Sequence, residues 1–133
     1  MTPDGLITHA SAFGPAETAE RLVEAITGRG LTVMARIDHA GAAAAVGLGL
    51  GPTEVFLFGD PRAGAHLMQA AQTLGIDLPL KALVWRDAAG TTWLGYNDPA
   101  WLARRHGAAG LEPRLAAMSR LLEAVAKDAT GVG

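Results

Sequence analysis

The sequence predicts a two-layer α+β domain, with helices packed on one face of a largely antiparallel sheet of about five strands. Two observations predict it. Five stretches have the length and residue types of strands, and two long segments repeat apolar residues at helical spacing. The chain has 133 residues, 50% of them hydrophobic, which is enough for one compact core. With no linker, repeat or low-complexity tract in sight, we expect a single domain over residues 1–133.

The chain begins with a predicted strand, a helix and a second strand. Residues 6–13 form the first strand, and Pro15 is pre-shaped for the first position of the helix that follows. Gly28 and Gly30 end this helix, and residues 31–37 alternate as in a half-buried strand. The apolar stripe of the helix consists of Ala19, Leu22, Val23 and Ile26.

The middle of the chain repeats one device, an Asp that caps a helix. Asp38 is placed to cap a short helix over residues 39–46, and residues 53–58 are apolar enough for a central strand. Asp60 and the following proline then open another helix, which runs to Gly75.

The last part predicts a hairpin and two helices. Residues 76–87 and 91–97 form the hairpin, and Asp98 caps a short helix whose basic end, Arg104 to His106, suits the negative pole of the helix. Pro113 opens the final helix. Its apolar stripe consists of Leu115, Met118, Leu122 and Val125.

Composition excludes several classes of function. The formal net charge is -2 without a basic stripe, so we expect no nucleic-acid partner, and the absence of cysteine excludes disulfides and thiolate chemistry. The N-terminus lacks the features of a secretory signal, and no apolar stretch approaches the roughly 20 residues that span a bilayer. We therefore expect a cytoplasmic protein that does not contact membranes.

Three blocks of the sequence resemble a known family. "ARIDHAGAA", "PTEVFLFGDPRAGAHLMQAAQTLGIDLPLKALVW" and "WLGYNDPAWLARRHG" closely resemble the domain of unknown function 302 family, in the same order, between Leu31 and Gly107. The resemblance implies a fold similar to the TATA-binding protein, with the order β-α-β4-α, and a homodimer. It points to no particular activity, and any cofactor stays unknown.

The resemblance also points to particular polar positions. Two departures from the family pattern lie close together: Asp60 stands where the family typically has Asn, and Ala65-His66 stands where it has Thr-Pro. A ligand that this loop binds would therefore differ from one bound by the typical family sequence. The family positions found here are Asp38, His39, Gly59, Pro61, Asp77, Pro79, Lys81, Tyr96, Asn97, Asp98 and Pro99.

Five of these residues are candidates for binding a ligand: Asp38, His39, Lys81, Tyr96 and Asn97. His39 has the chemistry of an acid/base or of a metal ligand, but we favour a structural or ligand-positioning role at this strand–helix junction over catalysis. Lys81 enters an apolar strand, where an unpaired charge is costly, so it either snorkels, pairs with Asp77 or binds an anion. Tyr96 and Asn97 close the neighbouring strand and are expected near Lys81.

Three functions follow from these residues. The first is a homodimeric module that binds a small polar or anionic metabolite at the five candidates. The second is an enzyme with His39 as acid/base and Lys81 or Tyr96 stabilising negative charge. The third is a structural or partner-binding dimer with no small ligand. Whichever function holds, we expect Trp85, Trp93 and Trp101 to serve core or dimer packing. The four histidines have no metal-ligand spacing, so no metal site is predicted.

Overall fold

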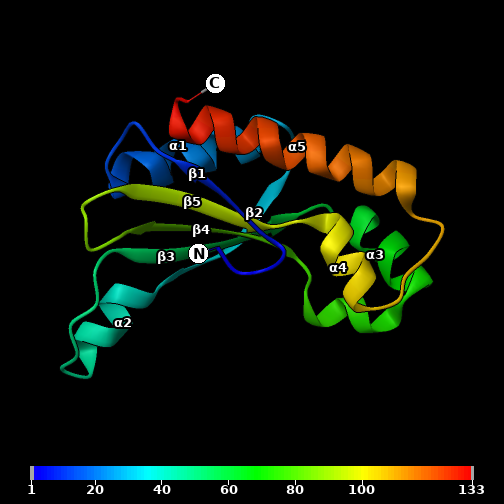
Figure 1. Cartoon of the computed structure of the whole chain (residues 1–133), viewed down its shortest axis with the longest axis horizontal. Helices are drawn as coiled ribbons and strands as arrows, with labels where there is room; N and C mark the ends of the chain where they lie inside the picture. The colour runs from blue at the N-terminus through cyan, green and yellow to red at the C-terminus, as the bar shows by residue number, and fades with distance from the viewer. Residues whose placement is uncertain (1, 133) are drawn as a thin grey trace.

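The computed structural model describes residues 2–132 and confirms the predicted α+β class (Figure 1). The elements in chain order are β1 (Leu6–Ala10), α1 (Pro15–Thr27), β2 (Thr32–Asp38), α2 (His39–Ala45), β3 (Thr53–Gly59), α3 (Pro61–Ala70), the 3₁₀ helix η1 (Gln72–Ile76), β4 (Leu80–Arg86), β5 (Thr92–Asn97), α4 (Pro99–Arg105) and α5 (Glu112–Thr130). The predicted order β-α-β4-α is present, with α2, α3, η1 and α4 placed in the connections.

The five strands form one antiparallel sheet in the order β1-β5-β4-β3-β2. Four consecutive strands, β2 to β5, make a meander, and β1 adds to its far side by pairing with β5. The first two strands of the sequence are therefore the two edges of the sheet. A bulge between Val33 and Ala35 shifts the register of edge strand β2.

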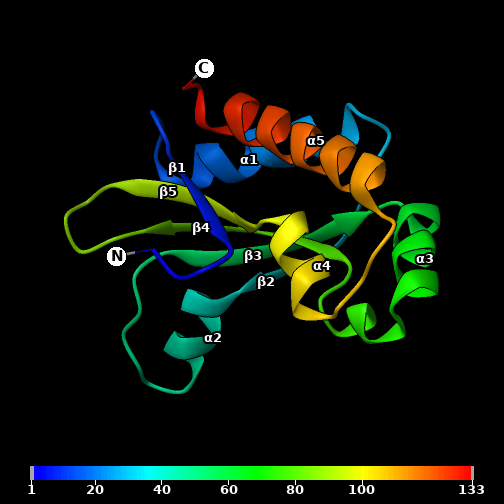
Figure 2. The same cartoon turned by 45° about the vertical axis from the view of Figure 1, so that its right-hand side comes forward.

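Helices α1 and α5 lie side by side over one face of the sheet (Figures 1 and 2). The alternation of β4 explains this layer, because Leu80, Ala82 and Val84 are buried beneath the helices while the residues between them are half-buried. Burying a large side chain stabilises the fold by about 1.5–3 kcal/mol. The side chains that fill this core include Leu22, Ile26, Phe56, Phe58, Leu94, Leu122 and Val125.

The other side of the sheet, which we call the open face, is covered by neither of these helices. It presents half-buried apolar side chains around one lysine. Its central residues are Val55, Leu57, Lys81, Leu83, Trp85, Trp93 and Gly95, which the strand register places next to one another. The predicted packing role of Trp85 and Trp93 fits this position, since the two rings stack with centroids 6.4 Å apart.

Helix α2 extends away from the sheet and has no buried residue (Figures 1 and 2). The segment from the end of β2 to the loop after α2 also exposes apolar side chains. Ile37 is 43% exposed, Val46 73%, Leu48 66% and Leu50 52%. A helix of seven residues has little stability of its own and normally depends on packing against the rest of the fold. None of the residues of α2 is buried, so little such packing is present here.

The three predicted Asp caps are confirmed. Asp38, Asp60 and Asp98 each accept a hydrogen bond from a backbone N–H in the first turn of the helix that follows. Such a cap typically contributes about 1 kcal/mol. The repeated Asp residues before predicted helices thus serve as N-caps.

Three predicted boundaries were wrong. The first strand ends at Ala10 and not at residue 13, because the Ser11 hydroxyl bonds to Thr18 and to the backbone N–H of Phe13 and so forms a turn. The strand predicted from residue 76 begins at Leu80. The helix predicted to run to Gly75 ends at Ala70, and η1 follows it and buries Leu74 among Leu67, Leu102 and Leu111.

Candidate functional site

The five predicted ligand-binding residues lie in different parts of the sheet. Asp38 ends β2 opposite Glu54, and His39 follows it with an exposed side chain at the start of α2. Lys81 is on β4, opposite Leu57, and Leu57 is three positions after Glu54 on β3. Strand geometry puts Asp38 and Lys81 roughly 14 Å apart between their Cα atoms. The structure therefore does not bring Asp38 and His39 to Lys81.

Tyr96 and Asn97 point to opposite faces of the sheet. Tyr96 is buried beneath the helices and stacks on the imidazole of His9, with ring centroids 5.8 Å apart. Burial raises the pKa of the Tyr96 phenol, with smaller contributions from nearby acidic groups. Asn97 shares the face of Lys81, and the register of β4 and β5 places it beside that residue. Of the five candidates, Lys81 and Asn97 are thus the pair that the structure brings together.

Asp38 belongs instead to an open cavity at the β2 edge. This cavity of about 450 Å³ lies between α1 and the sheet, and three of its charged groups contact one another. Arg36 donates two hydrogen bonds to Glu54, at 2.9 and 3.1 Å, and also pairs with Glu20 on α1 at 3.5 Å. The hydrogen bonding of Arg36 to the Glu54 carboxylate is the main reason that the pKa of Arg36 is raised.

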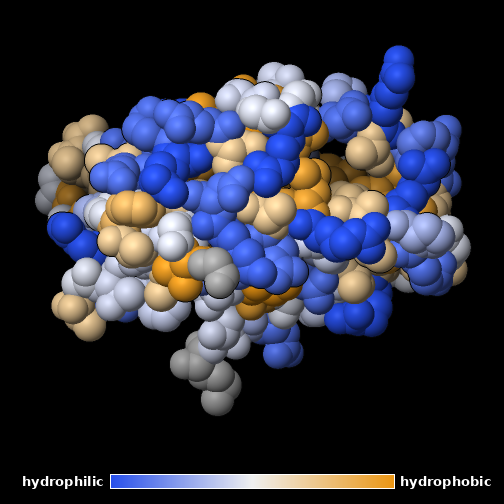
Figure 3. Space-filling model, turned by 90° about the horizontal axis from the view of Figure 1, so that it is seen from above, coloured by the Kyte–Doolittle hydropathy of each residue, from blue (hydrophilic) through white to orange (hydrophobic). Residues whose placement is uncertain are grey.

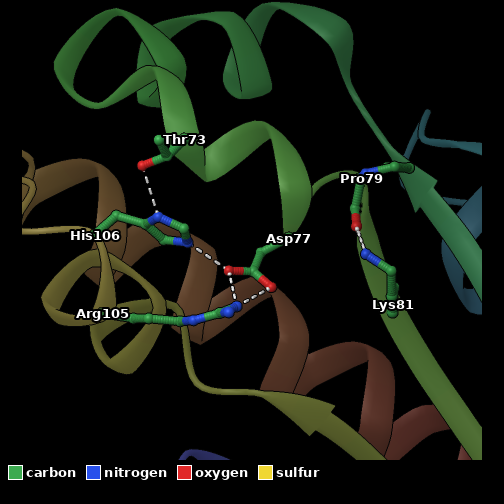
Figure 4. A network of polar contacts seen from close by, with 6 residues as sticks. All are labelled: Thr73, Asp77, Pro79, Lys81, Arg105 and His106. Atoms are coloured by element: carbon green, nitrogen blue, oxygen red, sulfur yellow. Dashed lines mark hydrogen bonds and ion pairs between the residues drawn. The ribbon is translucent and has the colours of Figure 1, made fainter.

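The densest polar contacts lie at the other end of the sheet, where η1 meets the end of α4 (Figure 4). His106 bridges the two elements. Its Nδ1 is 2.8 Å from the Thr73 hydroxyl, and its Nε2 is 2.5 Å from a carboxylate oxygen of Asp77. The guanidinium of Arg105 donates to both oxygens of the same carboxylate, at 2.7 and 2.8 Å. We call these four residues the Asp77 network.

The sequence explains why these groups meet. η1 places Thr73 near its start and Asp77 directly after its end, while α4 ends with two arginines and His106. Leu74 and Leu102 belong to one buried cluster and hold the two elements together. The side chains of His106 and Asp77 are only 8% and 15% exposed, so water competes weakly for their bond.

The charges of the network stabilise one another. Partial burial by itself would raise the pKa of Asp77, but hydrogen bonds from His106 and Arg105 outweigh it, and the pKa lies below its ordinary value. Lys81 is close enough to be affected by this carboxylate. Burial lowers the pKa of Lys81 and the attraction of Asp77 offsets part of that effect. Its ammonium donates to the carbonyl of Pro79 at 3.1 Å.

An apolar cavity of about 300 Å³ lies on the other side of the segment from η1 to β4. It opens between the end of the sheet, α3 and α5, and we call it the α3 pocket. Figure 3 shows a hollow rimmed by hydrophobic residues on this side of the molecule. The walls consist of Met34, Phe58, Leu67, Met68, Leu78, Leu80, Met118 and several small residues, with Asp60 at the loop.

Metal ligands are not gathered in the part of the chain that the structure describes. Within residues 2–132, no three side chains of His, Asp or Glu come together as a metal site would need. No helix of that same range combines the length and apolar character required to cross a bilayer.

A family model described as "Domain of unknown function DUF302" matches residues 7–129. The chain belongs to the DUF302 family. The crystal structure of an uncharacterised conserved DUF302 protein from Bacillus stearothermophilus superposes with a TM-score of 0.85 at 23% identity. The match covers 96% of this chain and 99% of that one, so the DUF302 fold extends over nearly the whole chain.

Curated relatives of this DUF302 chain carry the name of a transport protein. It is 49% identical over 102 residues to the fluoride-specific ion channel FluC 1 of Brucella suis biovar 1 and equally to FluC 1 of Brucella abortus biovar 1. The matched part covers 77% of this chain, and 40% and 38% of those relatives. The chain thus spans about 40% of the length of the curated relatives that it matches.

Sequence reasoning missed most of the Asp77 network. It assigned Arg105 and His106 to the negative pole of α4 and did not single out Thr73. Asp77 was noticed as a family position and as a partner for Lys81, and this was the one usable signal. The network depends on η1, and that helix was predicted partly as strand and partly as the end of the preceding helix.

Proposed function

We propose that this DUF302 chain is a homodimeric domain that binds a small molecule with an apolar body in the α3 pocket. The observation that carries the proposal is the cavity itself. About 300 Å³ is at the lower end of the range of small-molecule sites, and an apolar lining is typical of them. A cavity of this size in a small domain costs packing energy, which a ligand would recover.

The lining defines the class of ligand. Three methionines, Met34, Met68 and Met118, adapt their shape to an apolar guest. Among the lining residues only Asp60 carries a charge, and its carboxylate disfavours an anion. The ligand we propose is therefore apolar, with a neutral donor or a cationic group placed toward Asp60.

Fragment binding tests this site. Indole and tryptamine should stabilise the protein against heat and show saturation transfer in NMR, whereas indole-3-acetate should do neither. Gly64→Leu should abolish binding, because a β-carbon at Gly64 points at Leu78 and Met68 of the pocket. Ala70→Leu, at an exposed position of the same helix, is the control that should bind normally. Equal behaviour of the two variants would contradict the proposal.

A polar or anionic ligand at the five residues predicted from the sequence stays a prediction. The pair that supports it is Lys81 and Asn97 on the open face. Native mass spectrometry of freshly purified protein, compared with its denatured mass, would reveal a ligand retained at either place. Lys81→Ala and Gly64→Leu would then separate the two sites. A cytoplasmic location likewise remains a prediction.

The open face and α2 support the homodimer. A sheet of five short strands presents roughly 500 Å² on one face, whereas a stable interface buries about 800 Å² per partner. The exposed apolar segment of α2 and its loop would supply the remainder. The strand register surrounds Lys81 with apolar residues in the centre of the open face, so apolar contacts would supply most of the interface.

Oligomeric state tests this part of the proposal. Light scattering after size exclusion should give twice the chain mass for the wild type and the single mass for Leu57→Glu on the open face. Arg114→Glu, on the exposed side of α5, reverses one surface charge far from that face and should remain a dimer. A monomeric wild type would contradict the dimer and leave the α3 pocket untouched.

A second candidate function is supported by the comparisons alone. Relatives named as fluoride-specific ion channels contain a region that is 49% identical to this chain. Two domains joined in one polypeptide often serve one function. We propose that such a domain regulates fluoride transport. Removing the matching region from the Brucella suis relative should then change fluoride efflux from liposomes. Unchanged efflux and unchanged fluoride dependence would contradict this role.

A further inference from the structure

The Asp77 network has the connectivity of an activated nucleophile. We propose that Thr73, His106 and Asp77 act as nucleophile, general base and orienting carboxylate in the hydrolysis of a small ester. The Thr73 hydroxyl lies 2.8 Å from one nitrogen of the His106 ring, and the other nitrogen lies 2.5 Å from Asp77 (Figure 4). Both contacts are hydrogen bonds, which is the connection that a nucleophile–base pair and its orienting group need.

The hydrogen bonds fix which nitrogen carries the proton. Asp77 is a carboxylate and can only accept, so Nε2 of a neutral His106 ring carries the hydrogen. Nδ1 then holds the free lone pair, and the Thr73 hydroxyl donates to it. This is the tautomer that a base needs in order to take a proton from the hydroxyl.

The environment separates the roles of the three groups. The His106 and Asp77 side chains are nearly buried, which holds the ring in one orientation, whereas Thr73 is exposed and open to a substrate. Asp77 is held further by Arg105, which makes Arg105 a positioning residue. The Arg105 side chain is 49% exposed, so it can also attract a negatively charged group of the substrate. The substrate class that fits is a small ester whose acyl part bears a carboxylate.

The reaction balances without any further reactant than water. The Thr73 oxygen bonds to the carbonyl carbon while its proton passes to Nδ1 of His106. The bond from that carbon to the leaving oxygen breaks, and His106 returns the proton to the departing alcohol. Water then attacks the acyl group on Thr73, again through His106, and releases the acid with the threonine restored.

A purely structural network is the competing explanation, since the same bonds tie η1 to α4. The two explanations differ on Thr73. A structural network needs Asp77, Arg105 and His106, which connect the elements, but it does not need the exposed hydroxyl at the end of the series. Thr73→Val removes this hydroxyl and keeps the shape of the side chain, so it separates catalysis from folding.

The experiment measures hydrolysis of 4-nitrophenyl acetate and of mono(4-nitrophenyl) succinate by the full chain. We expect turnover above the buffer rate, faster with the anionic succinate ester. Thr73→Val should lower kcat/KM at least 100-fold with an unchanged melting temperature, and Thr73→Ser should retain most activity. Intact mass spectrometry should show a succinyl adduct that maps to Thr73. His66→Gln, an exposed histidine on α3, controls for hydrolysis by surface imidazoles and should be fully active.

Three results would overturn the proposal. The first is a wild-type rate equal to the buffer rate with both esters. The second is a Thr73→Val rate equal to that of the wild type, which would place the activity elsewhere. The third is an adduct that maps to another residue. None of these results depends on whether the α3 pocket binds a ligand or the chain dimerises.

Discussion

The indole ring of Trp85 lies over Gly95 of the neighbouring strand, so closely that a β-carbon at Gly95 would stand 3.0 Å from the ring. The absence of a side chain there lets the indole lie flat on the open face. We expect Gly95→Ala to displace the ring and to lower the free energy of unfolding by about 1 kcal/mol. Urea unfolding followed by tryptophan fluorescence measures both effects, and unchanged stability with an unchanged emission spectrum would contradict the prediction.

Gly64→Ala should have the opposite sign. Gly64 lies within α3, and a β-carbon there would meet Leu78 and Met68 at 3.9 Å, an ordinary van der Waals distance. Alanine stabilises a helix interior by about 0.5–1 kcal/mol relative to glycine. Thermal unfolding of the two glycine variants side by side should therefore give a lower melting temperature for Gly95→Ala and a higher one for Gly64→Ala.

Two Asp–Arg pairs of different burial should differ in strength. Asp77 accepts bonds from Arg105 and His106 with 15% of its side chain exposed, whereas Asp128 pairs with Arg29 with 56% exposed. We expect Asp77→Asn to cost about 2 kcal/mol because it weakens charge-assisted hydrogen bonds shielded from water. Asp128→Asn should cost less than about 1 kcal/mol. Chemical denaturation of both variants decides this, and equal losses would argue against a special role of burial.

Acid should remove the contribution of Asp77. Its pKa is lowered in the folded state, so its stabilisation is complete above the ordinary carboxyl pKa near about 4 and is lost as the pH falls through the lower folded value. The difference in unfolding free energy between wild type and Asp77→Asn should therefore shrink in this acid range. A difference that stays constant from pH 7 to pH 2 would show that the charge of Asp77 contributes nothing.

His9 should titrate below its ordinary pKa. Burial is the main cause of this lowering, and the attraction of Glu123 offsets it in part. Its Nε2 has no hydrogen-bond partner within residues 2–132, so nothing compensates the loss of water around the charged ring. The stability that the neutral His9 ring contributes is fully present above the pKa of His9 in the unfolded chain. It is lost as the pH falls through the lower pKa of His9 in the folded protein. An NMR titration of the ring protons tests this, and a pKa at or above about 6.5 would contradict it.

Local chemistry made much of the fold predictable. Asp38, Asp60 and Asp98 cap their helices as expected, because a cap depends only on residues a few positions apart. The alternating pattern of residues 80–86 places one side of β4 in the core for the same reason. These features need no knowledge of distant parts of the chain.

The site was harder to predict because its contacts join distant residues. His106 lies 29 positions from Asp77 and 33 from Thr73, and only the packing of η1 against α4 brings them together. The prediction relied on strand ends to bring the candidate residues together. In an antiparallel meander, however, successive strands end at opposite ends of the sheet. Asp38 therefore lies away from Lys81 although both residues lie near a strand end.

The pairing of β1 with β5 has a consequence for synthesis of the chain. Leu6 pairs with Asn97, so β1 has no partner during synthesis until about 90 further residues have followed. The meander from β2 to β5 can assemble meanwhile from neighbouring hairpins. Until then β1 stays unpaired with its apolar side chains outside the sheet. Contacts between residues so far apart in the sequence slow folding. The residues of β1 are thus synthesised before the rest of the sheet but pair after it.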